Sequence, residues 1–139
     1  MLGLFKSKKK TTQAKILVVD DEQDIVNTVQ YRLKACDFNV ITANDGKEGL
    51  EKVINEKPDL VLLDINMPIM DGHEMLERLR SRPDLKDIPV IMLTAYSDRR
   101  DISKAADLGI EHYVTKPFDF TDLMEKISKA LESSEAADN

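Results

Sequence analysis

The stretch "KILVVDDE" (15–22) decides the fold, because a continuous apolar run ends in two adjacent carboxylates, Asp20 and Asp21. The apolar residues follow one another without alternating with polar ones, which is typical of a parallel strand buried on both faces of a sheet. Two like charges at the end of a buried strand repel each other, so they indicate a site that needs both of them.

Four more apolar runs predict four more strands: "FNVIT" (38–42), "DLVLLD" (59–64), "IPVIMLT" (88–94) and "EHYVT" (111–115). The segments between them carry apolar residues at helical spacing, as at Ile25, Val29 and Leu33. This alternation predicts an α/β fold with right-handed crossovers. We expect a doubly wound, flavodoxin-like sheet of five parallel strands in the order 2-1-3-4-5, with five helices.

Two helix ends can be read from single residues. Gly109 follows a helical run that contains Ile102 and Ala105, and it predicts a C-terminal cap because glycine adopts the left-handed conformation without strain. Asp119 or Thr121 is predicted to open the last helix, since both residue types cap N-termini well.

The composition is that of an ordinary globular domain. The chain has 139 residues, of which 42% are hydrophobic and 33% are charged. No apolar run approaches the roughly 18 residues that a membrane span requires. We expect one folded domain over 14–132, preceded by a basic flexible tail over 1–13 and followed by a flexible tail over 133–139.

Charge is distributed unevenly along the chain. The first 15 residues hold five lysines and no acid, although the whole chain has a net charge of −6. The acidic body argues against direct nucleic-acid binding, because phosphate contacts need clustered Lys and Arg. The tail is expected to be solvated rather than bound to a membrane. With no secretory signal and with Cys36 as the only cysteine, the cytoplasm is the expected compartment.

The polar residues that stand out all follow the carboxyl ends of predicted strands: Asp20, Asp21, Asp64, Thr94 and Lys116. Carboxyl ends of parallel strands meet at one edge of a sheet, where doubly wound folds bind their ligands. Two carboxylates about 5 Å apart repel by roughly 3 kcal/mol at an effective dielectric constant near 20. A lysine and a divalent cation would offset this repulsion, and oxygen ligands favour Mg²⁺ over zinc.

Each of these residues also has an ordinary interpretation. An aspartate or threonine after a strand can cap the next helix, and a lysine can be a surface residue. Singly these roles are common, but a complementary set at four strand ends indicates one site. His73 and His112 are not expected to form a metal pair, and we expect both at the surface.

At these positions the chain resembles the receiver domain of two-component response regulators, the CheY-like superfamily. The resemblance covers residues 14–132. It rests on four motifs that appear in order: "VVDDE" (18–22), "LLDINMPIMDG" (62–72), "MLTAY" (92–96) and "YVTKPF" (113–118). It implies a signalling module of the stand-alone type, whose chemistry is limited to its own phosphorylation and slow dephosphorylation, rather than an enzyme.

The resemblance also implies roles at the acidic positions. Asp64 is the expected phosphoacceptor, which takes a phosphoryl group from a phosphohistidine. Asp20 and Asp21 are the expected metal-site acids, with Asp21 the more direct ligand and Asp20 acting through water. The backbone carbonyl of Asn66 is the expected third protein ligand beside Asp64. Mg²⁺ is the expected cofactor, and Mn²⁺ is expected to substitute for it.

Four further positions take their roles from the same resemblance. Thr94 and Lys116 are expected to contact the phosphoryl group, and Tyr113 is expected to turn inward when Thr94 moves. The Lys116–Pro117 peptide bond is expected to be cis. Asn66 and Tyr96 are expected to set the lifetime of the phosphorylated form, with Tyr96 shielding it from water.

The expected partners are a histidine kinase or a histidine phosphotransfer protein, and a downstream protein that reads the face of helix four, strand five and helix five. The domain is expected to be a monomer or a weak dimer. A phosphotransfer intermediate in a multi-step relay is an alternative that the sequence does not separate. A metal-dependent small-molecule phosphatase is disfavoured, because the haloacid-dehalogenase type needs an aspartate where Asn66 stands. A flavin-binding module is also disfavoured, because the acids would repel its phosphate.

Overall fold

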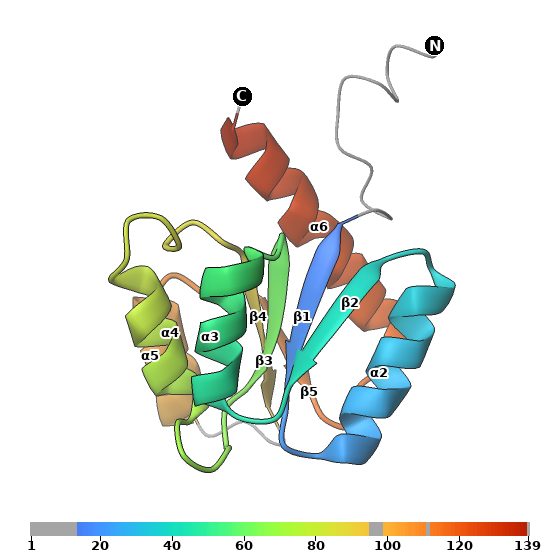
Figure 1. Ribbon diagram of the computed structural model, residues 1–139, viewed down its shortest axis with the longest axis horizontal. Helices are drawn as coiled ribbons and strands as arrows, with labels where there is room; N and C mark the ends of the chain where they lie inside the picture. Colours follow the sequence, from blue (N-terminus) through green and yellow to red (C-terminus); the bar gives the residue numbers. More distant parts are fainter. Residues whose placement is uncertain (1–13, 95–98, 111, 139) are drawn as a thin grey trace.

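The computed structural model describes residues 14–94, 99–110 and 112–138. The described residues form five strands that alternate with five helices (Figure 1). The strands are β1 (Lys15–Val19), β2 (Asn39–Ala43), β3 (Leu60–Asp64), β4 (Val90–Thr94) and β5 (His112–Thr115). The helices are α2 (Gln23–Ala35), α3 (Gly46–Glu56), α4 (Gly72–Arg80), α5 (Arg99–Asp107) and α6 (Phe120–Asp138).

The five strands make one parallel sheet in the order β2-β1-β3-β4-β5, which confirms the predicted fold class and strand order. Strand β1 is the second strand of the sheet and pairs with β2 on one side and with the central strand β3 on the other. In this register Val19 of β1 pairs with Leu63 of β3. The residues that follow Val19 therefore lie next to Asp64, the last residue of β3.

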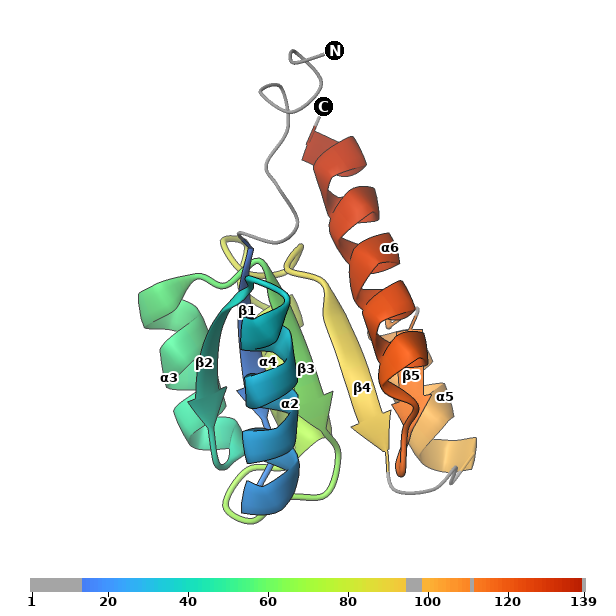
Figure 2. The same cartoon turned by 90° about the vertical axis from the view of Figure 1, so that its right-hand side faces the viewer.

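The helices cover both faces of the sheet, as two views of the ribbon show (Figures 1 and 2). Helices α3, α4 and α5 pack on one face, where alternate strand residues such as Leu17, Leu63 and Met92 are fully buried. Helices α2 and α6 pack on the other face against Val18 and Leu62. Because both faces are covered, the strands contain the continuous apolar runs seen in the sequence.

Short polar residues and a glycine set several helix ends. The side chains of Asp45 and Asp71 accept hydrogen bonds from the backbone N–H of Glu48 and Glu74 and so cap α3 and α4. Gly109 follows α5 with a φ of 85°, the left-handed conformation expected of a C-terminal cap. Asp119 directly precedes α6, and its Oδ1 accepts the N–H of Thr121.

One predicted boundary differs from the structure. The segment 133–139 was expected as a flexible tail, but α6 continues as a helix to Asp138. The sequence there is "SSEAADN", which holds no proline or glycine to end a helix and contains Ala and Glu, which favour one. Within the described ranges, none of the helices is both long enough and apolar enough to span a membrane.

Candidate functional site

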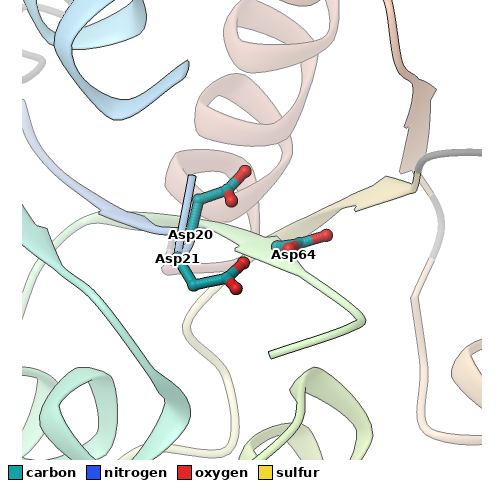
Figure 3. A group of neighbouring side chains, drawn as sticks. All are labelled: Asp20, Asp21 and Asp64. Carbon is teal, nitrogen blue, oxygen red and sulfur yellow. The ribbon is translucent and has the colours of Figure 1, made fainter. Parts of the chain in front are cut away.

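Three carboxylates meet at the carboxyl edge of the sheet between β1 and β3. Asp20 and Asp21 follow β1 directly, and Asp64 ends β3. One oxygen from each of the three side chains lies within 4.8 Å of the others. Figure 3 shows the three carboxylates extending in the same direction from adjacent strand ends. Asp20 and Asp64 are buried, whereas Asp21 is exposed.

Lys116 reaches this cluster from the loop after β5. Its ammonium Nζ lies 2.7 Å from Asp20 Oδ2 and 3.3 Å from Asp64 Oδ1. A third carboxylate contacts it as well, because Glu22 Oε1 lies 3.0 Å away. The lysine is itself buried, with 9% of its surface exposed. The site therefore holds one ammonium among four acids, and its net charge is negative.

The electrostatics of the cluster follow from burial and crowding. Burial, and next the charge on Asp20, raise the pKa of Asp64 from its ordinary 3.8 to about 7, although Lys116 acts in the opposite direction. Burial alone would lower the pKa of Lys116. Its contacts with the Asp20 and Glu22 carboxylates outweigh burial, so the pKa of Lys116 lies above its ordinary value. Burial and the neighbouring Asp20 therefore outweigh the attraction of Lys116 for the charged Asp64 carboxylate.

The donor set fits a divalent cation. Hard cations such as Mg²⁺ bind carboxylate oxygens and keep several waters. Asp21 and Asp64 offer such oxygens within one site, and exposed Asp21 leaves room for water. A cation at this position would offset both the burial of the Asp64 carboxylate and the charge on Asp20, which together raise the pKa of Asp64. Asn66 lies two residues beyond Asp64 and is exposed, and its role as a carbonyl ligand stays a prediction.

The loop after Asp64 is held close to the site by glycine packing. The Gly72 N–H donates to the carbonyl of Ile65, and the Gly46 N–H donates to the carbonyl of Met70. A Cβ on Gly72 would lie 2.2 Å from the carbonyl oxygen of Asp64, and one on Gly46 would lie 2.3 Å from that of Met70. Only glycine lets the loop fold back this closely, so both glycines help to place Asp64.

The predicted phosphoryl-contacting residues lie at the same edge. Thr94 ends β4 and is buried, and its carbonyl accepts the backbone N–H of Lys116. The Lys116–Pro117 peptide bond is cis. Tyr113 lies one strand further along, half-buried, and its hydroxyl donates to the carbonyl of Ile102 at 3.0 Å. That hydrogen bond connects β5 to α5.

Sequence reasoning placed most of this site but missed one contact. Asp20, Asp21, Asp64, Thr94 and Lys116 all lie at one edge of the sheet, as predicted. Glu22 was given no role, although it stands directly after the two aspartates in the same motif. Tyr96, the expected shield, lies outside the described residues. His73 was expected at the surface, but it is buried in the first turn of α4.

Comparison with known proteins gives a consistent result. The family model for the response regulator receiver domain matches residues 16–128. A receiver domain protein (CheY-like) from Methanospirillum hungatei has a crystal structure that is similar with a TM-score of 0.84 at 32% identity, covering 90% of this chain and 98% of that one. Chemotaxis protein CheY4 from Vibrio cholerae is similar with a TM-score of 0.80 at 30% identity, covering 85% of this chain and 98% of that one.

Curated relatives extend the comparison to longer proteins. The alkaline phosphatase synthesis transcriptional regulatory protein PhoP of Bacillus subtilis is 42% identical over 123 residues, which are 88% of this chain and 50% of that protein. A probable transcriptional regulator from Guillardia theta is 39% identical over 126 residues, 91% of this chain and 48% of that protein. The chain spans about half the length of the curated relatives it matches.

Proposed function

Because the chain belongs to the response regulator receiver domain family, we propose that it accepts a phosphoryl group on Asp64 and changes its partner binding in response. Receiver domains are signalling modules of two-component systems rather than classical enzymes. The observation that carries the proposal is the convergence of Asp20, Asp21 and Asp64 within 4.8 Å, beside the ammonium of Lys116.

The proposed reaction is a transfer between two side chains. A carboxylate oxygen of Asp64 forms a bond to the phosphorus of a phosphohistidine, and the nitrogen–phosphorus bond breaks. The histidine nitrogen leaves with the electron pair and takes up a proton. In the later hydrolysis a water oxygen attacks the phosphorus, the bond to Asp64 breaks, and inorganic phosphate leaves. Both steps place negative charge on phosphoryl oxygens, which the site must stabilise.

Receiver domains bind Mg²⁺ at an acidic pocket, and the three aspartates would hold it here. When bound, the metal supplies positive charge to the phosphoryl oxygens. The residues of the chain do the remaining work. Lys116 lies 3.3 Å from Asp64 Oδ1 and is positioned to contact a phosphoryl oxygen on that side chain. Thr94, at the end of the adjacent strand, offers a hydroxyl donor.

The proposed switch couples this site to a distant face. Phosphorylation adds charge and acceptor oxygens at Asp64. Thr94 reorients to satisfy them, and Tyr113 exchanges its present position for one behind Thr94. The hydrogen bond from Tyr113 to Ile102 would then break, which would change the face formed by α5, β5 and α6. Such a change is a shift between two packings, which a partner protein reads.

A histidine kinase or histidine phosphotransfer protein is the partner class implied by the family. The downstream target, the single-domain organisation and the cytoplasmic location stay expectations. Transcriptional control is one output that the names of the relatives suggest. Passing the phosphoryl group onward to another histidine is the alternative role. Measuring reverse transfer from the phosphorylated chain to a histidine phosphotransfer domain distinguishes this relay role from a switch that acts through partner binding.

The direct test uses a small-molecule phosphodonor such as acetyl phosphate with Mg²⁺, followed by intact mass measurement. The proposal predicts one added phosphoryl group on the native chain and none on Asp64→Asn. It also predicts that chelating the metal prevents the addition. Equal addition to the native chain and to Asp64→Asn would contradict the proposal, because another residue would then be the acceptor.

A further inference from the structure

Three carboxylates already surround Lys116 before any phosphoryl group arrives, and the ammonium donates a hydrogen bond to one of them, Glu22. An ammonium group has three N–H donors. Three carboxylates surround it, Asp20 at 2.7 Å, Glu22 at 3.0 Å and Asp64 at 3.3 Å. A phosphoryl group on Asp64 brings new acceptor oxygens. A hydrogen bond from Lys116 to one of these oxygens competes with the hydrogen bond that it donates to Glu22.

The three partners differ in how easily they can be given up. Asp20 is completely buried, and its other oxygen accepts the backbone N–H of Glu22 at 2.9 Å. Losing Lys116 would leave the Asp20 charge buried without a cation, which is costly. Asp64 carries the phosphoryl group itself and moves with it. Glu22 has 58% of its side chain exposed, so water can replace the lysine there at little cost.

The side chain of Glu22 also does not cap the helix that follows it. Glu22 is the N-cap residue of α2, yet its side chain makes no capping hydrogen bond. The corresponding side chains before α3 and α4, Asp45 and Asp71, both accept a backbone N–H. At Glu22 the carboxylate extends to Lys116 instead, across 94 positions of the sequence.

We propose that Glu22 is the exchangeable partner of Lys116: it holds the ammonium in the resting protein and is replaced by a phosphoryl oxygen when Asp64 is phosphorylated. This inference rests on the proposed function and adds a positioning residue to it. Because the Glu22 contact must break before Lys116 can bind the new oxygen, Glu22 weakens the affinity of the site for a phosphoryl group. Removing the contact should therefore tighten binding.

The test measures how tightly the full chain binds beryllium fluoride, a phosphoryl mimic, by calorimetric titration at fixed Mg²⁺. Glu22→Gln removes the charge and the ion pair. Glu22→Asp keeps the charge but is one methylene shorter, so its carboxylate is withdrawn from Lys116. Asp24→Asn is the matched control, since it removes one exposed negative charge from the first turn of the same helix. Asp24 is not among the acids within 4 Å of Lys116 Nζ.

We expect Glu22→Gln and Glu22→Asp each to tighten binding of the mimic by about fivefold, the value of one partly exposed ion pair. Asp24→Asn should change it by less than about twofold, since screened charges that do not touch contribute little. Unfolding measurements on the same variants separate any change in helix stability from the change in binding. A structural role alone would alter unfolding but leave the affinity ratio unchanged.

Three results would overturn the inference. Glu22→Gln binding the mimic no more tightly than the native chain would show that the contact does not compete. Equal tightening by Glu22→Gln and Asp24→Asn would show a general charge effect instead of an exchange. A native chain that neither binds the mimic nor takes a phosphoryl group from acetyl phosphate would overturn the proposed function and this inference together. If the native chain does both and the Glu22 variants match it, only the inference fails.

Discussion

Lys116 and Asp20 come from opposite ends of the described domain, yet Lys116 Nζ lies 2.7 Å from Asp20 Oδ2 and both side chains are buried. The pair joins the end of β1 to the loop after β5, across the centre of the sheet edge. It therefore links the acidic cluster to the part of the fold that contains Tyr113.

Replacing Lys116 should destabilise the metal-free protein strongly. Lys116→Met leaves Asp20 and Asp64 buried without their cation, and we expect the free energy of unfolding to fall by about 3 kcal/mol. Lys126→Met is the control, because Lys126 pairs with Asp122 on the surface of α6 and should contribute about 0.5 kcal/mol. Urea denaturation of both variants in the presence of a chelator measures the difference, and equal losses would contradict the account.

The stability of the metal-free protein should depend on pH through Asp64. Its folded-state pKa is raised to about 7, so the fold favours the uncharged carboxyl. The stability that protonation contributes is complete below pH 3.8, the ordinary pKa, and is lost as the pH rises through about 7. Denaturation from pH 5 to pH 8 should show the native chain losing stability relative to Asp64→Asn. Groups that do not contact Asp64 titrate equally in both proteins, so a difference in stability that stays constant with pH would refute this origin.

Mg²⁺ should stabilise the native chain by binding the folded cluster. At a concentration 100 times the dissociation constant, the expected gain is about 2.7 kcal/mol. Asp21→Asn removes an exposed ligand and should reduce this gain at equal Mg²⁺, whereas Asp24→Asn removes the same charge outside the cluster and should not. Thermal unfolding across a Mg²⁺ titration measures the stabilisation of the native chain and of both variants. If Mg²⁺ stabilised Asp21→Asn as much as the native chain, the metal would bind elsewhere.

Gly72 should tolerate no side chain, whereas Gly109 should tolerate one at a small cost. A Cβ on Gly72 would clash with the Asp64 carbonyl and, at 2.9 Å, with Ile65 Cα, so the loop must move. We expect Gly72→Ala to lower the free energy of unfolding by about 3 kcal/mol and to weaken Mg²⁺ binding. Around Gly109 the nearest contact, Arg80 Nε, is 3.9 Å away, and only its φ of 85° is unfavourable for alanine. Gly109→Ala should therefore cost about 1 kcal/mol and leave Mg²⁺ binding unchanged.

Ile69 should gain stability when it is changed to glycine. Its φ is 71°, a left-handed conformation that strains a β-branched residue, and 76% of its surface is exposed, so little packing is lost. We expect Ile69→Gly to raise the free energy of unfolding by about 1 kcal/mol. Ile69→Ala keeps most of the strain and serves as the comparison. A loss of stability in the glycine variant would show that the Ile69 side chain makes contacts that offset the strain.

Much of the fold and the site could be predicted because the decisive signals are local. Each strand is a short apolar run, and its last residue fixes which edge of the sheet a polar side chain occupies. Asp64 and Lys116 could therefore be placed together from their positions in the sequence alone. Strand order followed from the fold class, and Gly109 identified a helix end that the structure contains.

The features that were missed depend on packing between distant segments. The contact between Glu22 and Lys116 exists only after β1 and β5 take their places in the sheet, and no local pattern specifies it. The close approach of Gly72 to the Asp64 carbonyl likewise depends on how the loop folds back. The burial of His73 did have a local signal, because it lies three residues before buried Leu76 on the same helix face.

The central claim is that Asp64, among the three clustered carboxylates, carries the phosphoryl group. After reaction with acetyl phosphate and Mg²⁺, borohydride reduces an aspartyl phosphate to homoserine, and peptide mass spectrometry then locates the change. The account predicts homoserine at position 64 and unmodified aspartate at positions 20 and 21. Homoserine at position 20 or 21, or none in a chain that has demonstrably gained a phosphoryl group, would contradict it.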